Sequence, residues 1–167
     1  MIPIGLIKAA KLSEVTGPAI VLPSGKYGET FLVTGGKEPL ACCLSGAHKN
    51  HAFLASASEN WHGAAIQGVS LEVCPDSIYS VSENDLALGS VVLGSEGAFF
   101  VAKVKTQGWT DTLPISILRG SDIRDNGSIE KVGFVRWRAV LDVGNRREVV
   151  FDTEGSGGGV DATLQAT

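Results

Sequence analysis

The sequence lacks any long apolar run. Glycine, serine and acidic residues interrupt every stretch before it reaches the roughly 20 predominantly apolar residues that a membrane-spanning helix needs. The first seven residues carry no positive charge ahead of Lys8, and no small-residue cleavage site follows them. This pattern is not that of a secretory signal. We therefore expect a cytoplasmic protein that does not have a membrane as a partner.

Cysteines are few, and the common catalytic motifs are missing. Cys42, Cys43 and Cys74 form an odd set, and the two adjacent residues could pair with each other only under strain, so we expect reduced thiols. Gly25-Lys26 is followed by Tyr27, where a phosphate-binding loop requires Ser or Thr. No G-x-G-x-x-G or G-x-S-x-G motif is present. These absences favour a non-catalytic role, and the sequence identifies no cofactor.

Basic residues are also scarce. The chain has 14 Lys and Arg against 18 Asp and Glu, and its net charge is −4. This balance makes nucleic acid an unlikely partner. Residues 50–102 contain no Lys or Arg, whereas all six arginines lie between Arg119 and Arg147. Segments of opposite charge such as these could attract each other within a domain or between neighbouring subunits.

What the sequence does contain is typical of short strands and tight turns. Val, Ile and Thr together make up 36 of the 167 residues, and 21 residues are glycine. The composition predicts a mainly β fold, an antiparallel barrel or sandwich built of hairpins with one or two short helices. We expect residues 1–154 to form a single β-rich domain and residues 155–167, which begin with a glycine-rich run, to form a flexible C-terminal tail.

Alternation of apolar and polar residues locates individual strands. It predicts one strand within residues 65–73, and a hairpin in which residues 88–93 and 98–104 flank a glycine-bounded loop. Residues 9–15 could form a short helix. Residues 82–85 resemble a helix-capping sequence that leads into a single turn.

A further hairpin is predicted around Gly144-Asn145. The length of its loop determines which residues of the two strands lie opposite each other. A two-residue loop would place apolar side chains opposite charged ones, whereas a three-residue loop sets Trp137 against Phe151. We therefore predict a three-residue loop with a bulge. The same register brings Arg136 near Asp152 on the outer face.

Residues 47–62 fit two interpretations. Their apolar residues could share one face of a helix. Alternatively, residues 40–44 and 52–57 are strands, and Gly46 and Asn50 belong to the turn between them. The hairpin is favoured because Gly and Asn suit a turn and because the neighbouring segments are also strands.

All three histidines lie in this segment. His48 and His51 are candidate metal ligands, with Cys42 or Cys43 as a third, and His51, Trp61 and His62 are candidate ligand-binding residues. A lone His-x-x-His spacing is a weak signal. On a helix His51 and His62 would lie about 16 Å apart, too far to share one ion. The plainer interpretation, surface and loop histidines, is favoured.

One strand face combines basic and aromatic residues. Phe134, Arg136 and Arg138 alternate there, and Arg and aromatic residues are enriched at protein interfaces. Our leading hypothesis is a non-catalytic binding or interaction module that forms a homo-oligomer through this face. The alternative is a small-molecule-binding or metal-assisted enzyme barrel with a histidine-rich loop pocket. Nucleic-acid binding on the Arg and aromatic face is the least favoured hypothesis.

Overall fold

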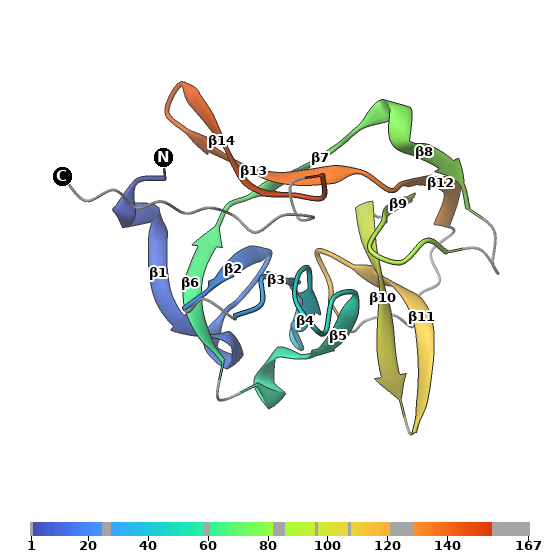
Figure 1. Cartoon of the computed structure of the whole chain (residues 1–167), viewed down its shortest axis with the longest axis horizontal. Coiled ribbons are helices and arrows are strands. Elements are labelled where there is room, and N and C mark those ends of the chain that lie inside the picture. The colour runs from blue at the N-terminus through green and yellow to red at the C-terminus, as the bar shows by residue number, and fades with distance from the viewer. Residues whose placement is uncertain are drawn as a thin grey trace.

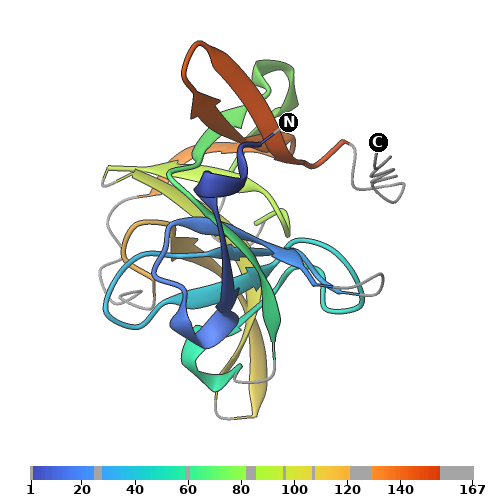
Figure 2. The same ribbon diagram turned by 90° about the vertical axis from the view of Figure 1, so that its left-hand side faces the viewer.

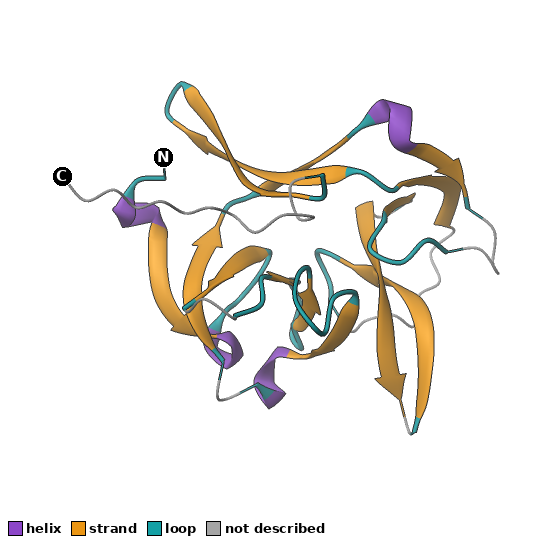
Figure 3. Ribbon diagram, viewed as in Figure 1, coloured by secondary structure: helices purple, strands orange, loops and turns teal. Residues whose placement is uncertain are grey.

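The computed structural model describes residues 2–24, 28–58, 61–81, 86–95, 97–106, 108–120 and 129–154. In these residues the chain is mainly β, as the composition predicts, and the helical parts are four single 3-10 turns (Figure 3). The turns are Ile4–Leu6, Leu12–Glu14, Ala55–Ala57 and Pro75–Ser77. None of the described helices is long and apolar enough to cross a membrane.

Fourteen strands are described. They are β1 (Ile7–Lys11), β2 (Ala19–Pro23), β3 (Phe31–Val33), β4 (Leu40–Cys43), β5 (His51–Leu54), β6 (His62–Gln67), β7 (Ser70–Val73), β8 (Ile78–Ser80), β9 (Val91–Gly94), β10 (Gly97–Thr106), β11 (Trp109–Ser116), β12 (Ile129–Phe134), β13 (Trp137–Val143) and β14 (Arg146–Asp152).

The strands form two sheets. Eleven belong to a large sheet in the order β1-β6-β2-β3-β4-β5-β10-β9-β12-β8, with β11 paired to β10. The other three form a small sheet in the order β14-β13-β7. All described pairings are antiparallel except that of β5 with β10. The small sheet lies along one side of the large one, at the top of Figures 1 and 2.

The main core lies where the two sheets meet. Trp137 and Ala139 of the small sheet share a buried cluster with Ile20, Phe100 and Ile115 of the large sheet. Rings pack edge to face there, since the Phe100 and Trp137 centroids are 5.8 Å apart at an interplanar angle of 79°. The cluster therefore joins strands β2 to β5 and β9 to β11 of the large sheet to β13 of the small sheet.

A second core covers the opposite side of β4. Cys42 belongs to the cluster between the sheets, whereas Cys43 belongs to a separate cluster with Leu12, Val21 and Phe31. Successive side chains of a strand point to opposite faces, so a strand buried on both sides divides its two cysteines between two cores. Both thiols are free and buried.

The two hairpins predicted in the first part of the chain are confirmed. β4 and β5 pair with Leu40 opposite Leu54, so the described residues between 47 and 62 do not form one long helix. Asn50 in the connecting turn has a φ of 66°, a conformation that asparagine tolerates better than most residues. β9 and β10 form the second hairpin, with Gly94 opposite Gly97.

Two segment predictions are wrong. Residues 9–15 are not a helix, because Ala9 and its neighbours pair with β6 and only Leu12–Glu14 is helical. A segment this short makes few helical hydrogen bonds, whereas strand pairing satisfies its backbone groups. Residues 65–73 are not one strand, because Gly68, with a φ of 74°, separates β6 in the large sheet from β7 in the small sheet. The capping sequence at residues 82–85 and the predicted tail at 155–167 lie outside the described residues.

The loop predicted between β13 and β14 is also wrong. Val143 pairs with Arg146, so the turn contains only Gly144 and Asn145. Gly144 has a φ of 59°, which a tight two-residue hairpin turn requires. The register then shifts between Ala139 and Val140, and this shift returns the ring of Phe151 to Trp137, with the centroids 5.2 Å apart. The predicted pairing of Trp137 opposite Phe151 is therefore wrong, because Phe151 lies opposite Ala139, although the two rings remain in contact.

Candidate interaction site on the three-stranded sheet

The small sheet has an inner and an outer face. Trp137, Ala139 and Leu141 alternate toward the core, with exposed fractions of 2%, 0% and 4%. Arg138 and Asp142 occupy alternate positions of the same strand and are exposed. The outer face therefore carries the charged residues of β13.

Arg136 lies at the end of the outer face where the chain enters β13. Its guanidinium group contacts the carboxylates of Asp76 and Glu154. Asp76 belongs to the 3-10 turn after β7, and Glu154 follows β14. Arg136 therefore connects the two outer strands of the small sheet at one end.

Two more arginines share a carboxylate in the middle of the sheet. The Nε atom of Arg138 donates to Glu72 at 2.8 Å, and the guanidinium of Arg147 contacts the other oxygen of Glu72. Arg147 also donates from Nε to Asp142 at 3.0 Å. These ion pairs join all three strands, β7, β13 and β14. We call this surface, formed by Glu72, Asp76, Arg136, Arg138, Asp142, Arg147 and Glu154, the arginine face.

The ion pairs also explain a buried residue on the outer face. Val140 lies between Arg138 and Asp142 on β13 and is only 1% exposed. Its cross-strand partners are Ser70 and Val149, which lie two residues from Glu72 and Arg147 on the neighbouring strands, and Glu72 and Arg147 contact each other. The Arg147 to Glu72 pair therefore crosses the position of Val140, and the aliphatic parts of these side chains exclude water from it.

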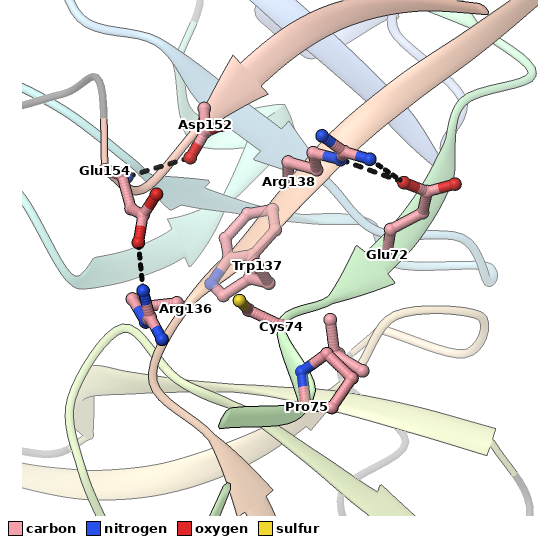
Figure 4. A pocket seen from close by; sticks show the side chains of 9 residues that line it. Glu72, Cys74, Pro75, Arg136, Trp137, Arg138, Asp152 and Glu154 are labelled. Atoms are coloured by element: carbon pink, nitrogen blue, oxygen red, sulfur yellow. Dashed lines mark hydrogen bonds and ion pairs between the residues drawn. The ribbon is translucent and has the colours of Figure 1, made fainter. Parts of the chain in front are cut away.

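A cavity of about 240 Å³ lies within the arginine face (Figure 4). Arg136 and Glu154 lie on one side of it, and Arg138 and Glu72 lie on the other, with Cys74 between them. Trp137 closes its inner end. The full lining is Glu72, Val73, Cys74, Pro75, Arg136, Trp137, Arg138, Asp152 and Glu154. The cavity thus presents both charge signs close together.

Cys74 is a half-buried thiol at the edge of this cavity. Its Sγ donates to Oδ1 of Asp76 at 2.7 Å, and this hydrogen bond raises the pKa of the Cys74 thiol although Arg136 acts in the opposite direction. The same bond and the Arg136 guanidinium lower the pKa of Asp76. A thiol with a raised pKa is a weak nucleophile near neutral pH. This environment does not suit Cys74 for covalent catalysis.

Replacing Asp76 by Asn is expected to make Cys74 more reactive. Loss of the carboxylate lowers the pKa of the thiol, so the rate of alkylation by iodoacetamide at pH 8 should rise by roughly threefold to tenfold. The pH profile of the rate should move to lower pH. In Cys74→Ser no thiol should react in the folded protein, because Cys42 and Cys43 are buried. An unchanged profile in Asp76→Asn would show that the hydrogen bond does not control Cys74.

The structure separates the three predicted interface residues. Arg136 and Arg138 line the same cavity, but Phe134 is 8% exposed and belongs to the interior. The predicted approach of Arg136 to Asp152 across the hairpin is wrong. Asp152 lies opposite Arg138, and the ion pairs of Arg136 are with Asp76 and Glu154. Glu72 and Asp76 also belong to the site, although the sequence pattern does not predict them there. The signal that could have found them is the acidic segment that precedes the arginine-rich one.

The predicted histidine site is divided among different contacts. Nδ1 of His48 lies 3.0 Å from Oε1 of Glu29, a buried carboxylate that the sequence analysis missed, and Nδ1 of His51 lies 3.2 Å from the carbonyl oxygen of His48. Trp61 and His62 line a separate cavity of about 130 Å³, together with Glu29. Among the described residues, no group of three or more His, Cys, Asp or Glu side chains could hold a metal ion.

Cys42 and Cys43, of which one was a possible third metal ligand, are both buried. Burial raises the pKa of Cys42 above its ordinary range and, together with the nearby Glu29 carboxylate, raises the pKa of Cys43 to about 12. Both thiols remain protonated at neutral pH. They therefore contribute to the two cores as small apolar side chains.

Comparison with known proteins identifies one family. The family model described as "Uncharacterised protein y4lG" matches residues 9–158. The "Uncharacterized protein y4lG" of Sinorhizobium fredii (strain NBRC 101917 / NGR234) is 26% identical over 137 residues, which cover 80% of this chain and 81% of that protein. No solved structure matches the chain. The matched residues include the small sheet, the arginine face and all of the large sheet except the first two residues of β1.

Proposed function

The chain belongs to the y4lG family of uncharacterised proteins, and from the geometry of its arginine face we propose that it is a non-catalytic interaction module that associates with copies of itself. The observation that carries the proposal is the sharing of Glu72 by Arg138 and Arg147 within a chain of alternating charges. A surface that carries both signs in a regular order can complement a second copy of itself across a two-fold axis.

The energetics of the ion pairs support this role. Arg136, Arg138 and Arg147 are 36%, 48% and 55% exposed, so water screens their ion pairs, and these contribute little to the stability of one chain. They do, however, hold the guanidinium groups in fixed positions. Less side-chain entropy is then lost when a partner covers them. The network is therefore better suited to an interface than to stabilising the isolated fold.

The arrangement favours protein over phosphate as the partner. Each of these three guanidinium groups already contacts a carboxylate, so a nucleic-acid backbone would have to displace Asp76, Glu72 or Glu154 and would meet their negative charge. The raised thiol pKa values support a role without covalent chemistry. β7 and β14 are the edge strands of the small sheet as described, and both border the arginine face. A second copy of the chain that binds there would cover their unpaired backbone groups.

The proposal is tested with the double variant Arg136→Glu with Arg138→Glu. Light scattering should give the wild-type protein a mass that is a multiple of 17.4 kDa, and the double variant should shift toward 17.4 kDa. The matched control is Lys8→Glu with Lys11→Glu on β1, which changes the net charge equally and should keep the wild-type mass. Higher salt should also weaken the association, because exposed ion pairs are screened. A wild-type monomer, or a double variant of unchanged mass, would overturn the proposal.

A further inference from the structure

The small sheet ends at β7, and the outer side of this strand has no neighbour among the described strands. Cys74, directly after β7, donates its backbone N–H to the carbonyl oxygen of Arg136 at 3.0 Å. Because hydrogen-bonded positions alternate along an antiparallel pair, Glu72 also directs its backbone groups toward β13. Leu71 and Val73 therefore direct their N–H and C=O groups away from β13, toward the free edge.

Apolar and polar side chains alternate along this edge. Leu71 and Val73 are partly buried and pack against the main core, whereas Ser70 is exposed and Glu72 belongs to the arginine face. A strand added beside β7 therefore needs apolar side chains on its inner face and polar side chains on its outer face. The other edge strand, β14, lacks this order, because its first three residues are all charged.

The sequence after β14 contains a segment with the matching order. Apolar and polar residues alternate without exception from Val160 to Thr167, which is the pattern of a half-buried strand. The apolar residues of this segment are Val160, Ala162, Leu164 and Ala166. The five residues before it, 155–159, are four glycines and a serine, which is the composition of a linker.

This linker is long enough to reach the β7 edge. Arg136 contacts both Glu154, next to the linker, and Asp76, just beyond β7, so the linker starts at the end of the sheet where β7 ends. A strand on the outer side of β7 lies three strand spacings from β14, about 14 Å. Five extended residues span up to about 17 Å. From there the chain would run antiparallel to β7, the orientation of every described pairing in the small sheet.

We propose that residues 160–167 bind to the free edge of β7 in the same chain and form a fourth strand of the small sheet. Their backbone groups pair with those of Leu71 and Val73, and their apolar side chains cover the partly buried end of the main core. An uncovered edge can pair with other chains, and this strand prevents such pairing at β7. The proposal is independent of self-association, for which the arginine face and the β14 edge stay available.

Hydrogen exchange of the whole chain, measured by NMR, tests this strand. The amides of Leu71 and Val73 should exchange slowly in the wild type. Leu164→Asp should speed their exchange by at least about tenfold, because the new carboxylate would have to be buried against the core. Gln165→Asp is the matched control, since it changes the net charge equally on the outer face and should keep the wild-type exchange. Dilution of the protein should leave these rates unchanged, because the contact lies within one chain.

Three results contradict the proposal. Free exchange of the Leu71 and Val73 amides in the wild type would show that the β7 edge is uncovered. Equal exchange in Leu164→Asp and Gln165→Asp would show that the apolar face does not hold the segment in place. Faster exchange on dilution, or a lower light-scattering mass of Leu164→Asp, would assign the segment to a second copy. The arginine double variant reports on self-association alone, so the two proposals can fail separately.

Discussion

Replacing Trp137 by Ala is expected to lower the free energy of unfolding by about 3–5 kcal/mol, the range for truncating a buried large aromatic residue. Trp137 is 2% exposed and packs against Phe100 of the large sheet and Phe151 of β14. Its removal would leave a cavity at the contact between the two sheets and an unpaired carbonyl oxygen at Gly89. Urea unfolding followed by circular dichroism measures the change.

Two further tryptophan variants separate the contributions. Trp137→Phe keeps a ring in the core but loses the hydrogen bond to Gly89, and it should cost about 1–3 kcal/mol. Trp109→Ala is the control, because Trp109 is 77% exposed and its truncation should change stability by less than about 0.5 kcal/mol. If Trp137→Ala cost no more than Trp109→Ala, the two sheets would not depend on this residue for their packing.

Replacing Gly36 by Ala is expected to have the second large effect, a loss of roughly 2–4 kcal/mol. Gly36 has a φ of 95°, and a Cβ atom placed there would lie 2.2 Å from the carbonyl oxygen of Arg119. Because that obstacle is backbone, it cannot be relieved by a change of rotamer. The loop after β3 or the turn after β11 would have to move.

Gly144→Ala is the matched control for Gly36→Ala. Gly144 also has a positive φ, of 59°, but a Cβ atom there would meet nothing within 4 Å. Its substitution should therefore cost only the conformational strain, about 1–2 kcal/mol. The difference between the two variants in urea unfolding measures the close approach at Arg119. Equal losses would mean that the two backbone segments separate without cost.

The features that the sequence predicts correctly are local. The β4 to β5 hairpin follows from apolar runs on either side of a turn that contains Gly46 and Asn50, and its partners lie within fifteen residues of one another. The mainly β fold is likewise predicted from composition alone, from the content of Val, Ile, Thr and Gly. Neither feature requires knowledge of what packs on the hairpin.

The features that the sequence analysis missed depend on distant partners. Residues 65–73 show one continuous alternation, yet the strand divides because β6 pairs with β2 and β1 whereas β7 pairs with β13. Phe134 was expected beside Arg136 by the same alternation, but the chain changes sheets at residues 135–136 and the alternation does not continue across that point. Glu72 and Arg138 are 66 residues apart, a separation that no local pattern can connect.

The division of β6 from β7 also has a consequence for biosynthesis. When a ribosome has made the chain only as far as β12, β7 has no described sheet neighbour, and the apolar cluster that Trp137 and Ala139 complete lies open to water. Apolar surface of this kind is the usual starting point for aggregation during folding. A chain that stops before β13 is therefore expected to aggregate more readily than the full chain, because only the β13 to β14 hairpin covers this cluster.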